Sequence, residues 1–270
     1  MSEYAKLWRN DNYKNIELLS ATFKKFSYSK HWHDELSIGL IQKGVEALDF
    51  KGSKINIPQG HIVAINPSEV HTGYSGSKEG WTYRMFYFDV KLIESILEEH
   101  SSSNSVIINS PIIKDVSLYQ NLLKLHMSLE EQHFDLTKDS LLIMSIVELF
   151  NKHGDVKRKE TLEYKDLQTN NKAKEYLIDN CSENISLDEL SLFTQRDKYQ
   201  LIRNFKSQFG ITPHQFLVQL KTKNAKVLLE KGASITQTAL ECGFFDQSHF
   251  TKNFKSLFGV TPGLYINSLK

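Results

Sequence analysis

Apolar residues in the first third of the chain fall into short runs separated by Gly, Pro and Asn. Short apolar runs bounded by such turn residues predict β-strands. Many short strands with frequent turns are typical of a sandwich or barrel. The runs that carry this prediction of a β-rich domain near residues 20–90 are 36–41, 45–50, 55–57, 61–65 and 83–88.

The apolar spacing becomes helical from about residue 115. It predicts two amphipathic helices. The first is carried by Val116, Tyr119, Leu122, Leu123, His126 and Leu129, and the second by residues 141–149.

A polar, charged stretch without periodicity follows at residues 151–160. Such a stretch is typical of a connection between domains, so we predict a linker at residues 151–167. Helical spacing resumes near residue 171 and continues to the end. The chain is therefore predicted to be an α+β protein with two domains, residues 1–150 and 168–270.

A ten-residue segment occurs twice in the helical part. Residues 204–213 read NFKSQFGITP and residues 253–262 read NFKSLFGVTP, with eight of ten positions identical. In each copy a Gly stands where a helix can end in the left-handed conformation, and the Thr-Pro pair readily begins the next helix. Two copies of one helical unit are therefore predicted.

Each copy predicts a short helix, a tight turn and a longer helix. In the first, Ser186 begins a helix that ends near Phe193, a turn follows at 194–196, and the longer helix covers 197–209. This order is the helix-turn-helix pattern. In the second copy the short helix begins at Ser234, the turn lies at 241–244 and the longer helix at 246–258.

The two copies differ by one residue. Their short helices align at an offset of 48 and their longer helices at an offset of 49, so the second turn is one residue longer. Between the copies, residues 213–230 predict a helix about 27 Å long at 1.5 Å per residue. Two recognition helices held about 34 Å apart can enter successive major grooves on one face of DNA.

The Phe residues of the repeat have two interpretations. Aromatic side chains can stack on the bases of single-stranded nucleic acid. Their helical spacing instead favours packing in the core of each unit. The residues concerned are Phe205, Phe209, Phe250, Phe254 and Phe258.

The composition is that of a globular protein, and its charge distribution fits nucleic-acid binding. The 270 residues are 40% hydrophobic and 24% charged, with a net charge of +1. Residues 171–270 carry 13 Lys and Arg against 9 Asp and Glu, and residues 1–170 carry 20 against 23. The helical part is therefore +4 and the remainder −3, which fits a nucleic-acid module joined to an acidic regulatory part.

Other features narrow the class of protein. No apolar run reaches the roughly 18 residues that a membrane span needs, and the first residues are polar and acidic, so we expect a cytoplasmic protein. The two cysteines, Cys181 and Cys242, form no CxxC pair. A disulfide framework and a zinc finger therefore have no support.

The second copy closely resembles the AraC/XylS family of bacterial transcription regulators. The matching positions are Ala239, Gly243, Phe244, Asp246, Ser248, Phe250, Phe254, Lys255, Gly259, Thr261 and Pro262. The resemblance covers about residues 168–270 and implies two helix-turn-helix units joined by a long helix, bound to an operator in double-stranded DNA. Two departures concern the DNA sequence that is read: Lys252 stands where the family usually has Arg, and Ile202 occupies an outward position that is often polar.

The resemblance also implies which residues contact DNA. The implied base readers are Tyr199, Ile202, Arg203, Gln247, Ser248, Thr251 and Lys252. Of these, Arg203 has the geometry to bind guanine O6 and N7 with two hydrogen bonds. The implied phosphate contacts, which position the protein without reading sequence, are Gln195, Arg196, Lys198, Lys206, Lys221, Lys223 and Lys255.

The first domain resembles the cupin-like effector domain of the same family. The resemblance rests on His31-Trp32-His33-Asp34-Glu35, Gly44, the turn Pro58-Gln59-Gly60 and the segment from Asn66 to His71. It implies a barrel that binds a small-molecule effector, either a sugar or an amino acid or other carboxylate. The expected effector contacts are His31, His33, Trp81, Tyr83, Arg84 and Tyr87.

A metal site is the alternative use of these histidines. His31, His33, Glu35 and His71 are ligand types for zinc, iron or manganese. In enzymatic cupins, three or four residues separate the second His from a Glu. The corresponding positions of this chain are Ser37 and Ile38. We therefore expect no metal and no cofactor, and histidines that are structural or contact an organic effector.

The leading hypothesis is an effector-responsive regulator, most simply an activator that works with RNA polymerase, and not an enzyme. The alternatives are a metal-dependent cupin enzyme fused to a DNA-binding module and a DNA-binding protein that needs no ligand. The helices at 115–150 are expected to form a homodimer, or else to pack on their own barrel. The family resemblance also suggests that residues 10–13 act as an arm that closes over the effector.

Overall fold

The fold was obtained as a computed structural model that describes residues 3–10, 12–100, 106–130, 136–155, 164–183 and 185–269. The chain forms two compact units, residues 1–27 with 32–159 and residues 28–31 with 160–270. The first unit is rich in strands and the second is helical, which confirms the predicted α+β class.

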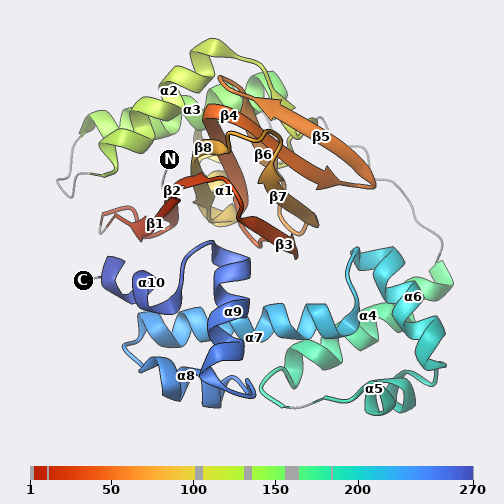
Figure 1. The fold of residues 1–270 in the computed structure, drawn as a ribbon. Coiled ribbons are helices and arrows are strands. Elements are labelled where there is room, and N and C mark those ends of the chain that lie inside the picture. The colour runs from red at the N-terminus through yellow and green to blue at the C-terminus, as the bar shows by residue number, and fades with distance from the viewer. Residues whose placement is uncertain are drawn as a thin grey trace. The chain divides into compact units, whose positions relative to one another are not determined.

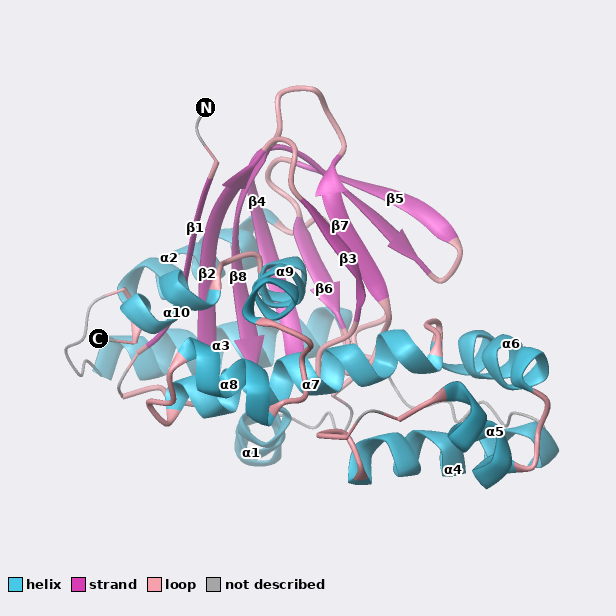
Figure 2. Ribbon diagram, turned by 60° about the horizontal axis from the view of Figure 1, so that its bottom comes forward, coloured by secondary structure: helices cyan, strands magenta, loops and turns pink. Residues whose placement is uncertain are grey.

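The described residues form nine strands, and the pairings β1-β2, β2-β8, β4-β5, β4-β6, β4-β7, β4-β8 and β6-β9 are antiparallel. One path of neighbours runs β1-β2-β8-β4-β6-β9, while β5 and β7 also pair with β4, and β3 pairs with β7 (Figure 2). The strands are β1 Tyr4–Arg9, β2 Ile16–Phe23, β3 Ser27–His31, β4 Leu36–Phe50, β5 Ser53–Pro58, β6 Ile62–Ile65, β7 His71–Ser75, β8 Trp81–Phe88 and β9 Ile112–Ile113.

Strand β4 joins two sheets. Its first half pairs with β6 and β8, and its second half pairs with β5 and β7. The register shifts between Ile41 and Lys43, and Gly44 has a φ of 74°. An irregularity of this kind bends a strand, so the two apolar runs predicted as separate strands belong to one strand that passes between the sheets.

Three helices cover one face of the β4-β8 sheet. They are α1 Val90–His100, α2 Val116–Ser128 and α3 Leu136–His153. Their apolar side chains form one core cluster with alternate residues of the strands, including Phe86 and Phe88. Because side chains alternate along a strand, Tyr83, Met85 and Tyr87 face the opposite side of the sheet.

Helix α2 packs on its own sheet, which is the second of the two arrangements expected for residues 115–150. Leu118, Leu122, Leu125 and Leu129 are fully buried in that core. Tyr119 is partly buried and donates a hydrogen bond from its hydroxyl to the Ile41 carbonyl, 3.0 Å away. The face that the helices were expected to share with a second chain is thus largely used within this unit.

The segment predicted as an effector arm is fixed to the same helices. Strand β1 pairs with β2 along its whole length. Asn10 is buried and donates its amide to the Leu129 carbonyl at 3.1 Å, and the Tyr13 hydroxyl donates to Asp139 at 2.7 Å. Of residues 10–13, Asp11 lies outside the described residues.

The second unit is built around helix α7, with one helix pair toward each end of it (Figure 1). Helices α5 and α6 form the first pair, and α8 and α9 form the second, so the two predicted helix-turn-helix units are confirmed. The helices are α4 Tyr164–Asp179, α5 Leu187–Thr194, α6 Lys198–Phe209, α7 Pro213–Glu230, α8 Ile235–Glu241, α9 Gln247–Phe258 and α10 Pro262–Ser268.

The repeated sequence determines where these helices begin and end. Gly210 and Gly259 both have a φ of 76°, and each amide donates to the carbonyl four residues earlier. Thr212 and Thr261 then cap α7 and α10, and Thr212 forms a capping box with Gln215. The Gly and Thr-Pro positions therefore act as predicted, as a left-handed helix end followed by a new start.

The predicted linker is shorter than the interval 151–167. Helix α3 continues to His153 and α4 begins at Tyr164, while residues 156–163 lie outside the described residues.

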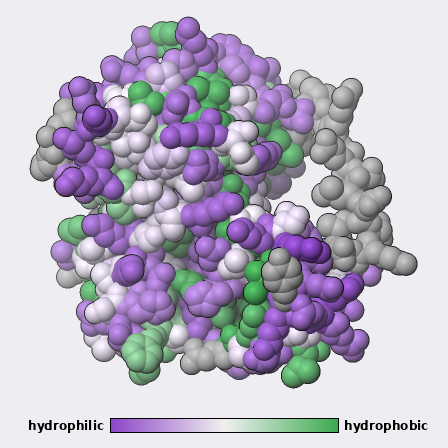
Figure 3. Space-filling model, turned by 45° about the vertical axis from the view of Figure 1, so that its right-hand side comes forward, coloured by the Kyte–Doolittle hydropathy of each residue, from purple (hydrophilic) through white to green (hydrophobic). Residues whose placement is uncertain are grey.

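Figure 3 shows one face of the surface, on which hydrophilic side chains predominate and hydrophobic ones form small groups. No helix among the described residues is both long and apolar enough to cross a membrane.

Candidate functional site

In both helix-turn-helix units, a residue with left-handed backbone conformation follows the first helix. Gln195 after α5 and Gly243 after α8 are both left-handed, with φ of 52° and 67°. Asp197 and Asp246 then accept backbone hydrogen bonds at the start of α6 and α9. The left-handed residues are 48 positions apart and the aspartates 49, so the predicted extra residue lies between Gly243 and Asp246.

A close contact explains the glycine of the second turn. A Cβ atom on Gly243 would lie 2.6 Å from the Ser182 carbonyl oxygen and 2.9 Å from Lys221 Nζ. Lys221 is 6% exposed and donates to the Gly243 carbonyl at 2.9 Å. Burial lowers the pKa of Lys221.

These contacts change the interpretation of Lys221. Its sequence position on the helix between the two units predicted a phosphate contact. The structure instead uses its ammonium group to hold the second turn, so Lys221 is left out of the proposed phosphate contacts.

Helix α6 separates a buried face from an exposed one. Leu201 and Phe205 are buried, whereas Arg203 and Lys206 are exposed. Tyr199 lies in α6, but its side chain is outside the described residues. The exposed face of α6 therefore carries two cationic side chains, Arg203 and, one turn later, Lys206.

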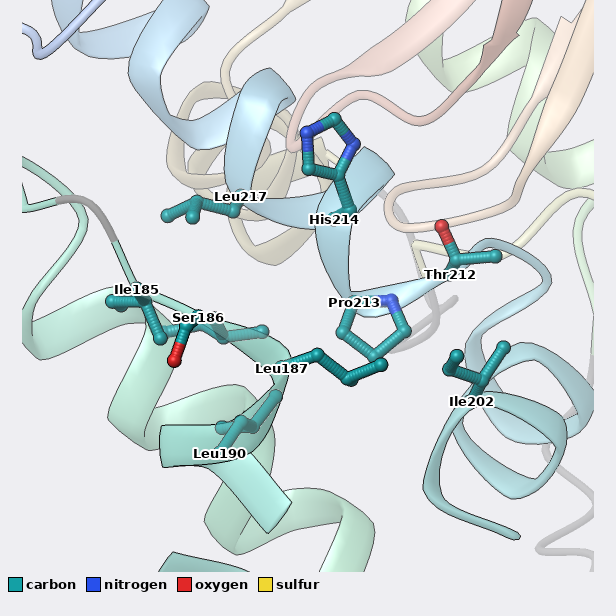
Figure 4. A pocket seen from close by; sticks show the side chains of 10 residues that line it. Ile185, Ser186, Leu187, Leu190, Ile202, Thr212, Pro213, His214 and Leu217 are labelled. Carbon is teal, nitrogen blue, oxygen red and sulfur yellow. The ribbon is translucent and has the colours of Figure 1, made fainter. Parts of the chain in front are cut away.

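Ile202 faces a cavity of about 230 Å³ between α4, α5, α6 and α7 (Figure 4). The cavity is mostly apolar, and Leu187, Leu190 and Pro213 line it together with Ile202. A place in the lining of this apolar cavity accounts for an apolar residue at a position that is often polar in the family. Ile202 is therefore not included in the base contacts proposed below.

Helix α9 presents polar side chains in the same way. Gln247, Ser248 and Lys252 are exposed, and Thr251 is half-buried. The Gln247 side-chain oxygen accepts a hydrogen bond from the Thr236 hydroxyl at 3.0 Å, which orients its amide. Phe250 and Phe254 are fully buried, so these aromatic residues pack in the core as their spacing predicted.

The remaining expected phosphate contacts are mostly at the surface. Gln195, Arg196, Lys198, Lys206 and Lys255 are exposed, and Lys223 is half-buried. Lys198 forms an ion pair with Asp188 of α5.

In the first unit, strand β8 divides the expected effector contacts between two faces. Trp81, Tyr83 and Tyr87 alternate along one face, and the Trp81 and Tyr83 rings are stacked with centroids 5.7 Å apart. Arg84 lies on the other face, where its Nη1 donates to His126 Nδ1 at 3.0 Å and to Glu130 at 2.5 Å. The structure therefore separates Arg84 from the aromatic residues that it was expected to join.

His126 explains part of this arrangement. Its Nδ1 accepts from Arg84 and its Nε2 donates to the Met85 carbonyl, so the ring is neutral with its proton on Nε2. Burial and then the nearby guanidinium lower the pKa of His126 to about 3. Arg84 and His126 thus form a structural network between β8 and α2.

Glu46 is an inward-facing acid that the sequence reasoning missed. It is buried on β4, and burial raises its pKa to about 8. Among the described residues, Glu46 Oε2, Ser37 Oγ and Trp81 Nε1 are buried polar atoms without a hydrogen-bond partner. The signal in the sequence was one of the two acids, Glu46 and Asp49, that interrupt the apolar run 45–50.

Three of the four expected metal-ligand residues lie together. His31, His33 and His71 are buried, and one ligand atom of each lies within 4.8 Å of the others. The His33 ring centroid is 5.1 Å from that of His71 and 5.0 Å from that of Tyr87. Glu35 is not part of this group of described residues.

Burial also affects the charge of this group. It lowers the pKa of His71 to about 4, although the Glu69 carbonyl and carboxylate act in the opposite direction. His71 is therefore neutral near pH 7.

Comparison with known proteins agrees with both halves of this description. The model of the AraC-like ligand binding domain matches residues 13–146, and that of a helix-turn-helix domain matches residues 193–268. The chain belongs to the AraC family of transcriptional regulators. It combines a ligand-binding domain of that family with its DNA-binding helix-turn-helix domain.

Two relatives and one solved structure show the extent of the similarity. The HTH-type transcriptional regulator YbfI of Bacillus subtilis (strain 168) is 29% identical over 226 residues, 82% of this chain and 81% of that protein. The transcriptional activator RhaS of Escherichia coli (strain SE11) is 32% identical over 77 residues, 28% of each chain. Unsaturated fatty acid-bound ToxT of Vibrio cholerae shares the fold, with a TM-score of 0.56, 17% identity and coverage of 98% of this chain and 95% of that one.

The comparisons decide between the hypotheses drawn from the sequence. The family and these relatives are transcriptional regulators, so the chain is a regulator and not an enzyme, and the hypothesis of a cupin enzyme fused to a DNA-binding module has no support.

Proposed function

We propose that this regulator reads an asymmetric DNA site with α6 and α9. The observation that carries the proposal is the equivalence of Arg203 and Lys252, which occupy the same position in the two copies and are both exposed. Cations at these positions suit guanine O6 and N7 in the major groove. The proposed base contacts are Tyr199, Arg203, Gln247, Ser248, Thr251 and Lys252.

Phosphate contacts are proposed around these helices. Their role is to fix the register of the protein on DNA through charge and not through sequence. The proposed residues are Gln195, Arg196, Lys198, Lys206, Lys223 and Lys255, which are exposed or half-buried.

Paired substitutions in α6 test this division of roles. Arg203→Ala is expected to lose about 1–3 kcal/mol of discrimination at one base pair. Lys206→Ala is expected to weaken binding to all duplexes alike and to lower the slope of log K against log salt by about one. Titrations of a selected and a scrambled site at several salt concentrations measure both quantities; equal losses on both sites for Arg203→Ala would contradict the proposal.

We infer that the effector binds on the inner face of the barrel. Stacked aromatic side chains, the buried Glu46 carboxyl and the Trp81 indole N–H supply apolar faces together with an acceptor and a donor. This combination suits a polyhydroxylated molecule such as a sugar, while the position of Arg84 removes the guanidinium that would favour a carboxylate. The proposed contacts, all within the first unit, are His33, Trp81, Tyr83 and Tyr87, with Glu46 added.

Tryptophan fluorescence tests the effector proposal. All three tryptophans, Trp8, Trp32 and Trp81, lie in the first unit. A panel of sugars, amino acids and small carboxylates is titrated, and a sugar is expected to change the emission of the wild type but not of Tyr83→Ala. A response to carboxylates alone would contradict the proposed class.

We further propose that the chain is a cytoplasmic homodimer that activates transcription. Activation through RNA polymerase is supported by the similarity of the helical domain to an activator, and a cytoplasmic location follows from a DNA target. A homodimer is supported by the exposed Val116 of α2 and Met144 of α3. Reporter transcription with and without the chain tests activation, and a fall in transcription would contradict it.

A further inference from the structure

Phe245 is the most exposed large hydrophobic residue among those that the structure describes, with an exposed fraction of 93%. The neighbouring Phe244 is only 7% exposed, and the centroid of its ring lies 5.1 Å from that of the buried Phe250. Two consecutive phenylalanines therefore have opposite environments. Phe244 belongs to the core of the second helix-turn-helix unit, whereas the ring of Phe245 adds almost nothing to that core.

The second turn places Phe245 directly before the recognition helix α9. Gly243 is left-handed, and Asp246 caps α9 by accepting a hydrogen bond from the His249 amide at 2.6 Å. In the first unit a single residue, the exposed cation Arg196, stands between the left-handed residue and the capping aspartate, and in the second unit two residues stand there. The longer turn therefore gives the second unit an exposed apolar side chain where the first unit offers a charged one.

This position adjoins the side chains that are proposed to read bases. Gln247 and Ser248, the first residues of α9, are exposed. Consecutive Cα atoms are about 3.8 Å apart, so the Cα atom of Phe245 lies within about 8 Å of that of Gln247. In helix-turn-helix proteins the N-terminal residues of the recognition helix contact base edges in the major groove. Phe245 therefore extends the exposed surface of α9 at the end that reads DNA.

A phenyl ring can recognise one feature of the major groove. It has no donor or acceptor for the hydrogen-bonding edges of the bases, and the negative faces of its π system do not favour phosphate. The apolar group that the major groove presents is the C5-methyl group of thymine, and Phe is among the side chains that contact it. Isolated apolar residues are common on protein surfaces, and Phe245 is distinguished from them by its place beside the base readers.

We propose that Phe245 contacts the C5-methyl group of a thymine and makes the second unit selective for thymine at one base pair. The contact rests on the proposed reading of DNA by α9. It adds a base-specific residue to the second unit that has no apolar counterpart in the turn of the first. The two units then differ in the chemistry of their turns, which suits an asymmetric DNA site.

Replacement of single thymines by uracil tests the proposal, because uracil lacks the C5-methyl group and keeps the same hydrogen-bonding edges. The DNA is a duplex selected by the full-length chain, and dissociation constants are measured by fluorescence anisotropy. Burial of one methyl group corresponds to about a fourfold change in affinity. The wild type is expected to lose about fourfold in affinity at one thymine, and Phe245→Ala is expected to lose nothing when that thymine is replaced.

Two further variants assign the effect to the apolar side chain at this position. Phe245→Leu keeps an apolar group and is expected to remain sensitive to uracil. Leu240→Ala is the matched control, because it removes another exposed apolar side chain, on α8, and is expected to keep the full fourfold effect. Helical circular dichroism in urea verifies folding, and Phe245→Ala is expected to unfold as the wild type does because its side chain is exposed.

The outcomes separate this proposal from the DNA-binding function. Uracil that leaves the affinity of the wild type unchanged at every position, or a folded Phe245→Ala variant that keeps the full uracil effect, overturns the thymine contact. Intact discrimination between the selected and a scrambled duplex in the same titrations leaves sequence-specific DNA binding standing in that case. Absence of this discrimination in the wild type overturns both.

Discussion

At the scale of single residues, Glu46 couples the first unit to pH. Its pKa is raised to about 8 in the folded chain by burial, whereas an ordinary glutamate titrates near 4.5. The folded state therefore holds the proton more tightly than the unfolded state does. The contribution of Glu46 to stability is fully present below pH 4.5, is lost as the pH rises, and is gone above about pH 8.

Glu46→Gln is predicted to remove this pH dependence. The free energy of unfolding should rise by roughly 3 kcal/mol at pH 8.5 and stay nearly unchanged at pH 4.5, since a neutral amide has no ionised form to desolvate. Urea unfolding followed by tryptophan emission reports the first unit, which holds all three tryptophans. The exposed Glu98→Gln is the control, and an equal gain at both pH values would contradict the explanation.

The two turn residues are predicted to respond to substitution in opposite directions. Gln195→Gly should stabilise the second unit by about 0.5–1 kcal/mol, because a left-handed residue with a side chain is strained. Gly243→Ala should destabilise it by about 2 kcal/mol or more, because the new Cβ would meet the Ser182 carbonyl. Helical circular dichroism in urea measures both changes, with unchanged tryptophan emission as the control; effects of the same sign would contradict the assignment.

At the scale of elements, the sequence predicted the helical unit better than the strand unit. The helix Pro213–Glu230 and the capped starts at Ser186 and Ser234 were predicted because local signals determine them. The sequence predicts two separate strands in place of β4, because Gln42 and Lys43 interrupt the apolar run. In the structure, the backbone pairing of β4 continues across these residues. Helix α1 was missed although Val90, Ile93 and Leu97 have helical spacing.

The candidate site shows the same contrast. The position of Arg84 was readable from the sequence, because residue 84 differs in parity from Trp81, Tyr83 and Tyr87 and so faces the other side of a strand. The burial of Lys221 was not readable, since it depends on how α7 packs against the second turn. Local periodicity thus assigns a side chain to a face, whereas tertiary packing decides what that face meets.

At the scale of the whole molecule, a second chain is predicted to bind through α2 and α3. Met144→Lys would place a charge on the exposed apolar residues proposed as the dimer contact and is expected to shift a concentration-dependent dimer to monomer. Leu192→Lys, at an exposed apolar residue of α5, is the control and should leave the dimer intact. Sedimentation velocity over a range of concentrations measures the equilibrium, and a monomeric wild type at all concentrations would contradict the homodimer.

The two helix-turn-helix units are proposed to read one DNA duplex together. Protection of guanine N7 from methylation, on a DNA fragment selected by the full-length chain, measures this directly. The predicted result is two protected major-groove segments about 10 base pairs apart for each chain, with Arg203→Ala losing protection in one segment and Lys252→Ala in the other. Protection of a single segment, or loss of the same segment in both variants, would contradict joint reading by the two units.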